Sequence, residues 1–184
     1  MSLAMHQMRM SGNRNFLLLL VEQGIGSGVI TNGRPLCVSK HFNCELGHTS
    51  IRYDGRQCEC GNRGCLELYA SMPNLLRGTQ FSSWKAVIDA LGTAPEAESL
   101  LRREAIYLTA GIVNMLNMVE VDTVYLAGDI RYGVSHLTNE IWKELKHRSP
   151  LRGKRLLQLL PADAREDVRL VSAADIVFSR FLDV

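Results

Sequence analysis

The chain has 184 residues, enough for one domain with a sizeable hydrophobic core. Lysine and arginine total 21 against 19 aspartates and glutamates, a formal net charge of +2, and no dense basic run indicates a nucleic-acid surface. The longest apolar run, Phe16 to Val21, is far too short to cross a bilayer, so no membrane partner is expected.

The first fifteen residues and the cysteine count bear on the compartment. Residues 1–15 have no apolar stretch followed by a small-residue cleavage site, and we interpret them as a tag-like or linker-like start. Five cysteines, an odd number, favour free thiols or metal ligands over a disulfide framework. The expected location is the cytoplasm.

A β-hairpin is predicted next. Phe16–Glu22 has the apolar pattern of a buried strand, and Gly28–Thr31 is its expected partner, with Gly24 and Gly26 in the turn between them. After a second tight turn at Asn32-Gly33, the sequence predicts a short strand over 49–53 and a helix from 65 that Pro73 interrupts.

The second half of the chain has the periodicity of helices. Apolar residues at helical spacing predict a helix over 84–91, with Ser83 as its N-cap and Gly92 at its end. A long helix should begin near Pro95 and run to Val119.

Further elements are expected toward the C-terminus. They are a strand at Val124–Ala127, a helix at Val134–His147, a basic turn around Pro150, a strand at Val168–Val171 and a last helix from Ser172 to Phe181. Strands followed by alternating strands and helices predict an α/β domain in which helices pack on a mixed sheet.

One segment contains the clearest chemistry. His48, Cys58, Cys60 and Cys65 lie within eighteen residues, with the turn-forming stretches "GRQ" and "GNRG" between them. Three thiolates and an imidazole are the ligand set of a closed tetrahedral zinc site. The alternative is a set of unligated thiols and an ordinary histidine on a polar loop, which the clustering disfavours. Cys37 and Cys44 lack such spacing and are interpreted as small apolar side chains.

The same segment resembles the signature of the ROK family (repressors, uncharacterised reading frames and sugar kinases), which includes the NagC/XylR/Mlc-type regulators. The resemblance rests on "ELGH" and "CECGNRGCLELYAS", and extends more loosely to "GIGSGVITNG" and "VYLAGDI". It implies that residues 16–184 are the C-terminal lobe of an actin-like (ribonuclease H-like) ATPase-type fold, with a zinc-binding segment at 48–65 and sugar bound in the cleft between two lobes.

Site residues follow from this resemblance. It makes His48, Cys58, Cys60 and Cys65 the zinc ligands, and it assigns contacts with sugar hydroxyls to Glu45, His48 and Glu67. An imidazole that binds metal through one nitrogen keeps the other for a hydrogen bond, here to a sugar. Without the resemblance, Glu45 and Glu67 would be interpreted as solvated surface acids.

The glycine string indicates a regulator more than a kinase. Gly24, Gly26 and Gly28 stand where kinase members carry a phosphate loop, but Glu22 and Gln23 replace its usual Gly and Thr. A carboxylate beside a triphosphate would repel it. A tight hairpin turn is the simpler reason for these glycines.

Two further observations favour the regulator. Ala127 and Asp129 replace the glycine pair that kinases usually have near adenosine, and no segment resembles the kinases' first phosphate loop or Asn-Asp pair. We therefore expect a C-terminal fragment of a NagC/XylR-type regulator that senses a sugar or sugar phosphate, with DNA bound only through an absent N-terminal domain. The alternatives are one lobe of a ROK sugar kinase and a purely structural zinc-bearing dimerisation module.

Self-association is expected on two grounds. ROK proteins are typically homodimers or homotetramers, and the long helix from Pro95 to Val119 has more apolar surface than a small lobe would cover. The alternative is that this helix is the central element of the core.

Overall fold

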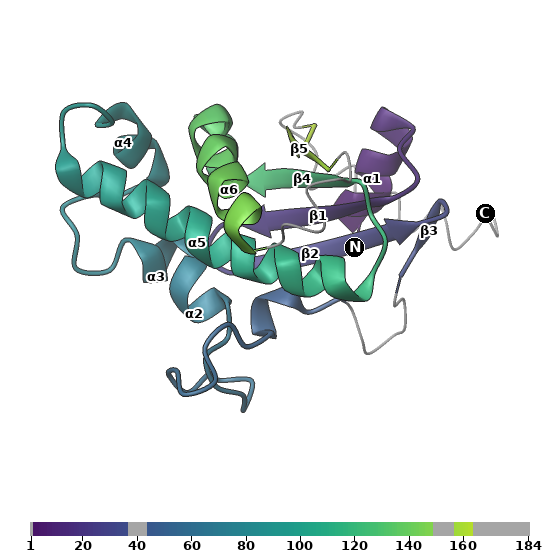
Figure 1. The fold of residues 1–184 in the computed structure, drawn as a ribbon, viewed down its shortest axis with the longest axis horizontal. Helices are drawn as coiled ribbons and strands as arrows, with labels where there is room; N and C mark the ends of the chain where they lie inside the picture. Colours follow the sequence, from purple (N-terminus) through teal and green to yellow (C-terminus); the bar gives the residue numbers. More distant parts are fainter. Residues whose placement is uncertain (1, 37–43, 149–156, 164–184) are drawn as a thin grey trace.

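The computed structural model describes residues 2–36, 44–148 and 157–163, which form a mixed sheet with helices on both faces (Figure 1). The strand order is β3-β2-β1-β4-β5. β1 (Phe16–Val21) pairs antiparallel with β2 (Ile25–Thr31) and parallel with β4 (Thr123–Gly128). β3 (Arg34–Pro35) and β5 (Gln158–Pro161) form the two edges. The expected α/β class and mixed sheet are confirmed.

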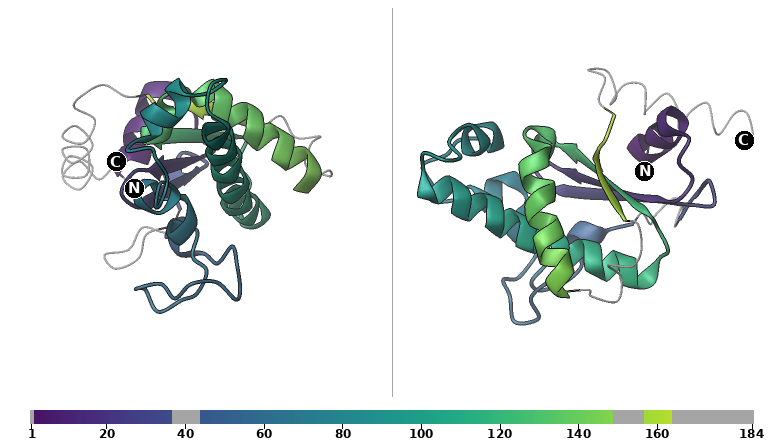
Figure 2. Two further views of the ribbon diagram at one scale, coloured as in Figure 1. Left: turned by 90° about the vertical axis from the view of Figure 1, so that its left-hand side faces the viewer. Right: turned by 45° about the horizontal axis from the view of Figure 1, so that its top comes forward.

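Helices cover the two faces of the sheet unequally. Figure 2 shows the strands between α1 on one side and α5 with α6 on the other. The helices of the described residues are α1 (Ser2–Ser11), α2 (Glu67–Ala70), α3 (Met72–Leu75), α4 (Trp84–Asp89), α5 (Pro95–Met118) and α6 (Val134–Arg148), with 3-10 turns η1 (Leu46–His48) and η2 (Asp129–Arg131).

β1 is apolar throughout because both of its faces are buried. Side chains alternate across a strand, so Leu17 and Leu19 pack in the cluster that contains α5 and α6. Phe16 and Leu18 point to the other face and pack in the cluster that contains Ala4 of α1. A continuous apolar run is the expected sequence of such a central strand.

The long helix α5 is a core element. Its buried residues include Leu108 and Ile112, which pack in the same cluster as the sheet and α6. Its larger exposed apolar side chains are Ile106 at 36% and Met118 at 66% exposure. Most of its apolar surface is thus covered within the chain, and the apolarity of α5 is no argument for self-association.

Several predicted elements are confirmed. The hairpin, α5, β4 and α6 lie within a few residues of their expected bounds. The Ser83 side chain accepts a hydrogen bond from the Ala86 backbone N–H, as expected of an N-cap for α4. Residues 2–11, within the segment expected to be linker-like, form helix α1, whose Ala4 is fully buried against the sheet.

Other expectations were wrong in detail. β2 begins at Ile25, so Gly26 lies inside a strand and only Gly24 is in the turn. The strand expected over 49–53 is a single bridge between Ser50 and Cys65. Pro73 lies in the first turn of α3, where its missing N–H costs nothing, and so helps to begin a helix. Strand β5 was not predicted.

Three expectations lie outside the described residues: the basic turn around Pro150, the strand Val168–Val171 and the helix from Ser172 to Phe181. Within the described ranges, no helix combines the length and apolarity that a bilayer crossing requires.

Glu104 of α5 provides a test of this packing. Its carboxyl group is fully buried, and neither oxygen has a hydrogen-bond partner in the described structure. Burial raises its pKa well above the ordinary value of 4.5. The folded state therefore stays protonated at pH values where the unfolded chain ionises, so stability falls as pH rises from about 4.5 toward the folded-state pKa.

We expect Glu104→Gln, which cannot ionise, to gain stability relative to the native chain as pH rises from 5 to about 9. The urea midpoints of both proteins, measured across this pH range, give the difference in stability between them. Effects of pH on other groups are common to both proteins and cancel. A difference that stays constant with pH would show that Glu104 is ionised in the folded state.

Candidate metal centre and adjoining acidic residues

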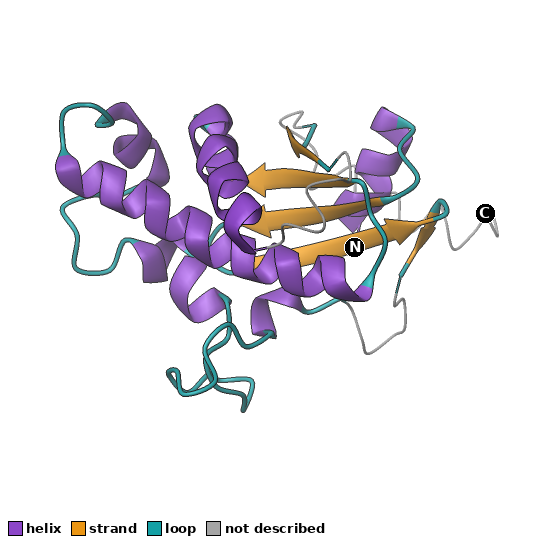
Figure 3. Ribbon diagram, viewed as in Figure 1, coloured by secondary structure: helices purple, strands orange, loops and turns teal. Residues whose placement is uncertain are grey.

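Two buried leucines attach the cysteine-rich segment to the core. Leu46 of η1 and Leu66, which precedes α2, are almost completely buried. Leu66 packs closely on α5, since a Cβ at Gly111 would lie 2.6 Å from its Cδ2 atom. Between these two leucines the chain is mainly loop and projects away from the sheet (Figure 3).

Backbone contacts make the projecting loop compact. The Ile51 N–H donates to the Gly64 carbonyl, and the Cys58 N–H donates to the Asn62 carbonyl at 2.8 Å. Gly64 has φ +66°, and a Cβ there would lie 1.7 Å from the Arg52 carbonyl oxygen. Only glycine fits this position, which accounts for one of the glycines between the cysteines.

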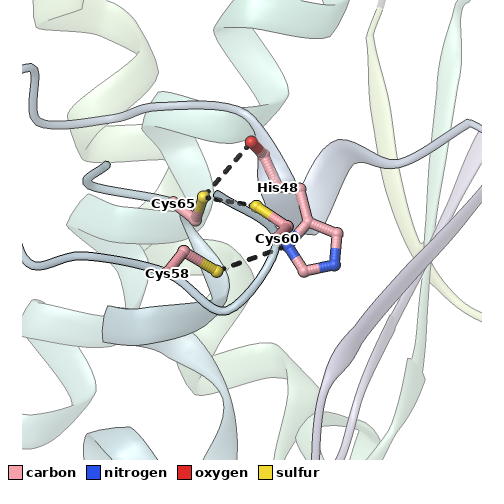
Figure 4. A group of neighbouring side chains, drawn as sticks. All are labelled: His48, Cys58, Cys60 and Cys65. Atoms are coloured by element: carbon pink, nitrogen blue, oxygen red, sulfur yellow. Dashed lines mark hydrogen bonds between the residues drawn. The ribbon is translucent and has the colours of Figure 1, made fainter. Parts of the chain in front are cut away.

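The four predicted ligands come together. The metal-binding atoms of His48, Cys58, Cys60 and Cys65 all lie within 4.8 Å of one another. Cys58 Sγ is 3.7 Å from His48 Nδ1, and Cys60 Sγ is 3.7 Å from Cys65 Sγ. Figure 4 shows Nδ1 directed at the sulfur atoms and the other ring nitrogen directed away from them.

The environment of the thiols suits a cation. Cys58 and Cys65 are buried, whereas Cys60 is exposed. Burial, reinforced by the neighbouring Cys58 and Cys60, raises the pKa of the Cys65 thiol to about 12. A backbone N–H of Asn62 lowers the pKa of the Cys60 thiol. Three thiolates this close would repel one another, and a divalent cation would offset their charge. The donor set therefore fits a metal ion.

The remaining cysteines are not part of this cluster. Cys44 is half-buried and packs at the edge of the main core, which agrees with an apolar role. Cys37 lies outside the described residues.

Glu67 lies in the first turn of α2 and binds the hairpin. Its Oε2 atom accepts a hydrogen bond from the Ile25 backbone N–H at 2.8 Å. Oε2 also lies close to Gly24, where a Cβ would come within 2.7 Å of it. The other carboxyl oxygen, Oε1, has no hydrogen-bond partner among the residues described. Glu67 is thus oriented by the start of β2.

Glu45 and His48 lie at the two ends of η1. Glu45 is exposed, and its backbone carbonyl accepts from the His48 N–H at 3.0 Å. Between them, Gly47 packs on β2 so closely that a Cβ would lie 2.5 Å from the Ile25 carbonyl oxygen. "ELGH" and "CLE" thus meet at one residue, Ile25, through its carbonyl and its N–H respectively. In the described structure neither the Glu45 nor the Glu67 carboxylate is hydrogen-bonded to the His48 ring.

A groove that the sequence did not reveal lies beyond the ends of β1 and β4. It has a volume of about 910 Å³, and its walls include Gln23, Trp84 and Asp129. The Trp84 Nε1–H donates to the Tyr132 carbonyl at 3.0 Å, which joins α4 to the loop after β4. No sequence pattern connects these two residues, which lie 48 positions apart.

Comparison with known proteins agrees with this architecture. A xylose repressor from Bacillus spizizenii is 30% identical over 181 residues, 94% of this chain and 46% of the repressor. A kanosamine kinase from Amycolatopsis mediterranei is 28% identical over 144 residues, 75% of this chain and 48% of the kinase. The chain thus spans about half the length of these curated relatives.

A solved structure, that of a ROK hexokinase from Thermus thermophilus, superposes with a TM-score of 0.76 at 25% identity, covering 94% of this chain and 63% of the hexokinase. This supports the expected actin-like kinase fold. The model of the ROK family matches residues 2–179. Repressors and sugar kinases are both among the relatives, and the chain belongs to the ROK family.

Proposed function

We propose that this chain is the sugar-sensing and self-association lobe of a NagC/XylR-type regulator, built around a structural zinc ion. The observation that carries the proposal is the orientation of His48. Its Nδ1 atom faces the three sulfur atoms, which leaves the second nitrogen for a ligand outside the cluster.

Zinc is the metal that suits these ligands best. Three thiolates and one imidazole form a closed structural site, with no position left for a reacting water. Tetrahedral zinc with ordinary bond lengths places two sulfur ligands about 3.8 Å apart and a sulfur and a nitrogen about 3.6 Å apart. Two ligand pairs, Cys58–His48 and Cys60–Cys65, at 3.7 Å each, are near these values.

The sugar contacts are proposed for Glu45, His48 and Glu67. Zinc bound at Nδ1 would leave a proton on Nε2, so His48 would donate to a sugar oxygen. Glu67 would accept a sugar hydroxyl through Oε1. Glu45 is exposed and available for the same role. Each sugar hydroxyl can both donate and accept a hydrogen bond. A His48 donor beside the Glu45 and Glu67 acceptors would therefore suit two or more neighbouring hydroxyls.

The glycine turn favours a regulator. A Cβ on Gly128 would lie 2.7 Å from Glu22 Cγ, so the Glu22 side chain packs against the end of β4, and Asp129 follows directly. Asp129 therefore lines the groove and Glu22 lies beside its Gly128 wall, and carboxylates at these positions would disfavour a triphosphate. The similarity to the xylose repressor also covers more of this chain than that to the kanosamine kinase.

The sugar kinase remains the second candidate because of the groove itself. It lies beyond the carboxyl ends of the parallel strands β1 and β4, a common position for ligands in α/β proteins. Arg77, Lys85 and Arg131 contribute positive charge to its walls, which would suit an anionic ligand. Both candidates share the proposed sugar contacts.

A purely structural zinc module is the third candidate, and it would not bind sugar. Self-association is proposed on family grounds alone, since α5 is covered within the chain. Light scattering of the purified chain tests it, and a strict monomer at high concentration would contradict it.

Zinc content gives the first test of the proposed function. Protein purified without added metal should contain about one equivalent of zinc. Cys60→Ser should lower this content and loosen the segment between His48 and Cys65, because the metal contributes folding free energy. Mass spectrometry and amide hydrogen exchange measure the two effects.

Cys44→Ser is the matched control, because it removes a cysteine outside the cluster. It should keep the zinc and the protection of the segment. A metal-free native chain with the same protection would contradict the zinc assignment.

Sugar titration and an ATPase assay give the second test. The chain should bind a sugar from a panel that includes xylose, glucose and N-acetylmannosamine, and Glu67→Gln should weaken binding about ten-fold because it removes a charged acceptor. A coupled assay for ADP should detect no sugar-dependent turnover. Turnover that Glu67→Gln abolishes would instead establish the kinase, and the absence of any sugar binding would favour the structural module.

A further inference from the structure

The β1–β2 turn contacts the proposed sugar site directly. Glu67 Oε2 lies where a side chain at Gly24 would be, with a Cβ–Oε2 distance of only 2.7 Å. The same oxygen accepts the Ile25 N–H at 2.8 Å. Because Gly24 has no Cβ, the Glu67 carboxylate has room to reach the backbone of β2.

From this contact we propose that Gly24 is a positioning residue for Glu67 and that it sets the affinity for sugar without touching it. With Oε2 held by Ile25, the carboxylate cannot rotate freely, and Oε1 is presented in one direction. This inference rests on the proposed function, because it assumes that Glu67 contacts the sugar. It assigns to the glycine turn a role that involves no phosphate.

Two properties of Gly24 make it suitable for a test. Its backbone is not in the left-handed region, so alanine is compatible with its conformation. The nearest atoms to an added Cβ belong only to the end of the Glu67 side chain, at 2.7 Å and 3.5 Å. Gly24→Ala should therefore fold and move the carboxylate away from the Ile25 N–H.

Gly26 provides a matched control two residues along the same hairpin. It is exposed, and a Cβ there would meet Leu20 at 3.9 Å, an ordinary van der Waals distance. Gly26→Ala makes the same chemical change without approaching Glu67. Both variants should keep the zinc content and the thermal midpoint of the native chain.

The first measurement follows the Ile25 amide in proton–nitrogen correlation spectra. An N–H that donates to a carboxylate makes a short, charge-assisted hydrogen bond, and its proton resonates at low field. We expect this signal to move upfield in Gly24→Ala and in Glu67→Ala, and to stay in place in Gly26→Ala. An unchanged Ile25 signal in Gly24→Ala would overturn the inference whether or not a sugar binds.

The second measurement is the dissociation constant for whichever sugar of the panel binds the native chain. Gly24→Ala should weaken binding about ten-fold, and Gly26→Ala should leave it unchanged. In a Glu67→Ala background, Gly24→Ala should have no further effect, because its only target is gone.

The outcomes separate the two proposals. If no sugar binds the native chain, the proposed function fails, and the Ile25 signal alone decides whether Gly24 positions Glu67. If sugar binds with equal affinity to the native chain and to Gly24→Ala, the proposed function stands and the positioning role is wrong. Equal weakening by both glycine variants would also overturn it, since that pattern indicates a general effect on the hairpin.

Discussion

The parallel pairing of β1 with β4, together with the antiparallel pairing of β1 with β2, determines where the two motifs of the proposed sugar site attach to the fold. β1 is buried on both faces and cannot shift without exposing apolar side chains to water. Its register fixes Ile25 opposite Val21 at the end of the hairpin. From there, the backbone of Ile25 contacts Gly47 through its carbonyl and Glu67 through its N–H. Ile25 thus connects the core of the sheet to both motifs of the proposed sugar site.

The cysteine-rich segment between Leu46 and Leu66 needs a source of stability other than the burial of apolar side chains. It projects from the sheet and has few apolar side chains, so its own burial contributes little free energy. Leu46 and Leu66 attach its two ends, but the loop between them is held by backbone hydrogen bonds and by the cysteine cluster. A metal ion is well suited to this situation, because it crosslinks four side chains that could not otherwise form a core. The same ion would fix the ring of His48, so stability and ligand recognition would depend on one interaction.

The sequence was most informative where chemistry or periodicity is local. The clustering of His48, Cys58, Cys60 and Cys65 could be predicted because one histidine and three cysteines at such short spacing are typical of a metal site. Helices α4, α5 and α6 could be predicted because their apolar periodicity is strong. The predictions failed where contacts between distant segments determine the local structure. Residues 2–11 form a helix that packs Ala4 on the sheet, yet the methionine-rich sequence has weak periodicity. Residues 49–53 resemble a strand, but the loop offers Ser50 only one bridging partner. The groove beside Trp84 depends on contacts between distant segments.

In the proposed site, one metal ion holds His48 through Nδ1 and leaves Nε2 for a sugar. Nitrogen-15 spectra of the histidine rings in the zinc-loaded chain, recorded before and after addition of a sugar that binds, test it most directly. We expect a metal-bound Nδ1, a protonated Nε2, and a shift on addition of sugar that is larger at Nε2 than at Nδ1. A His48 ring bound through Nε2, or one that does not respond to metal, would contradict it.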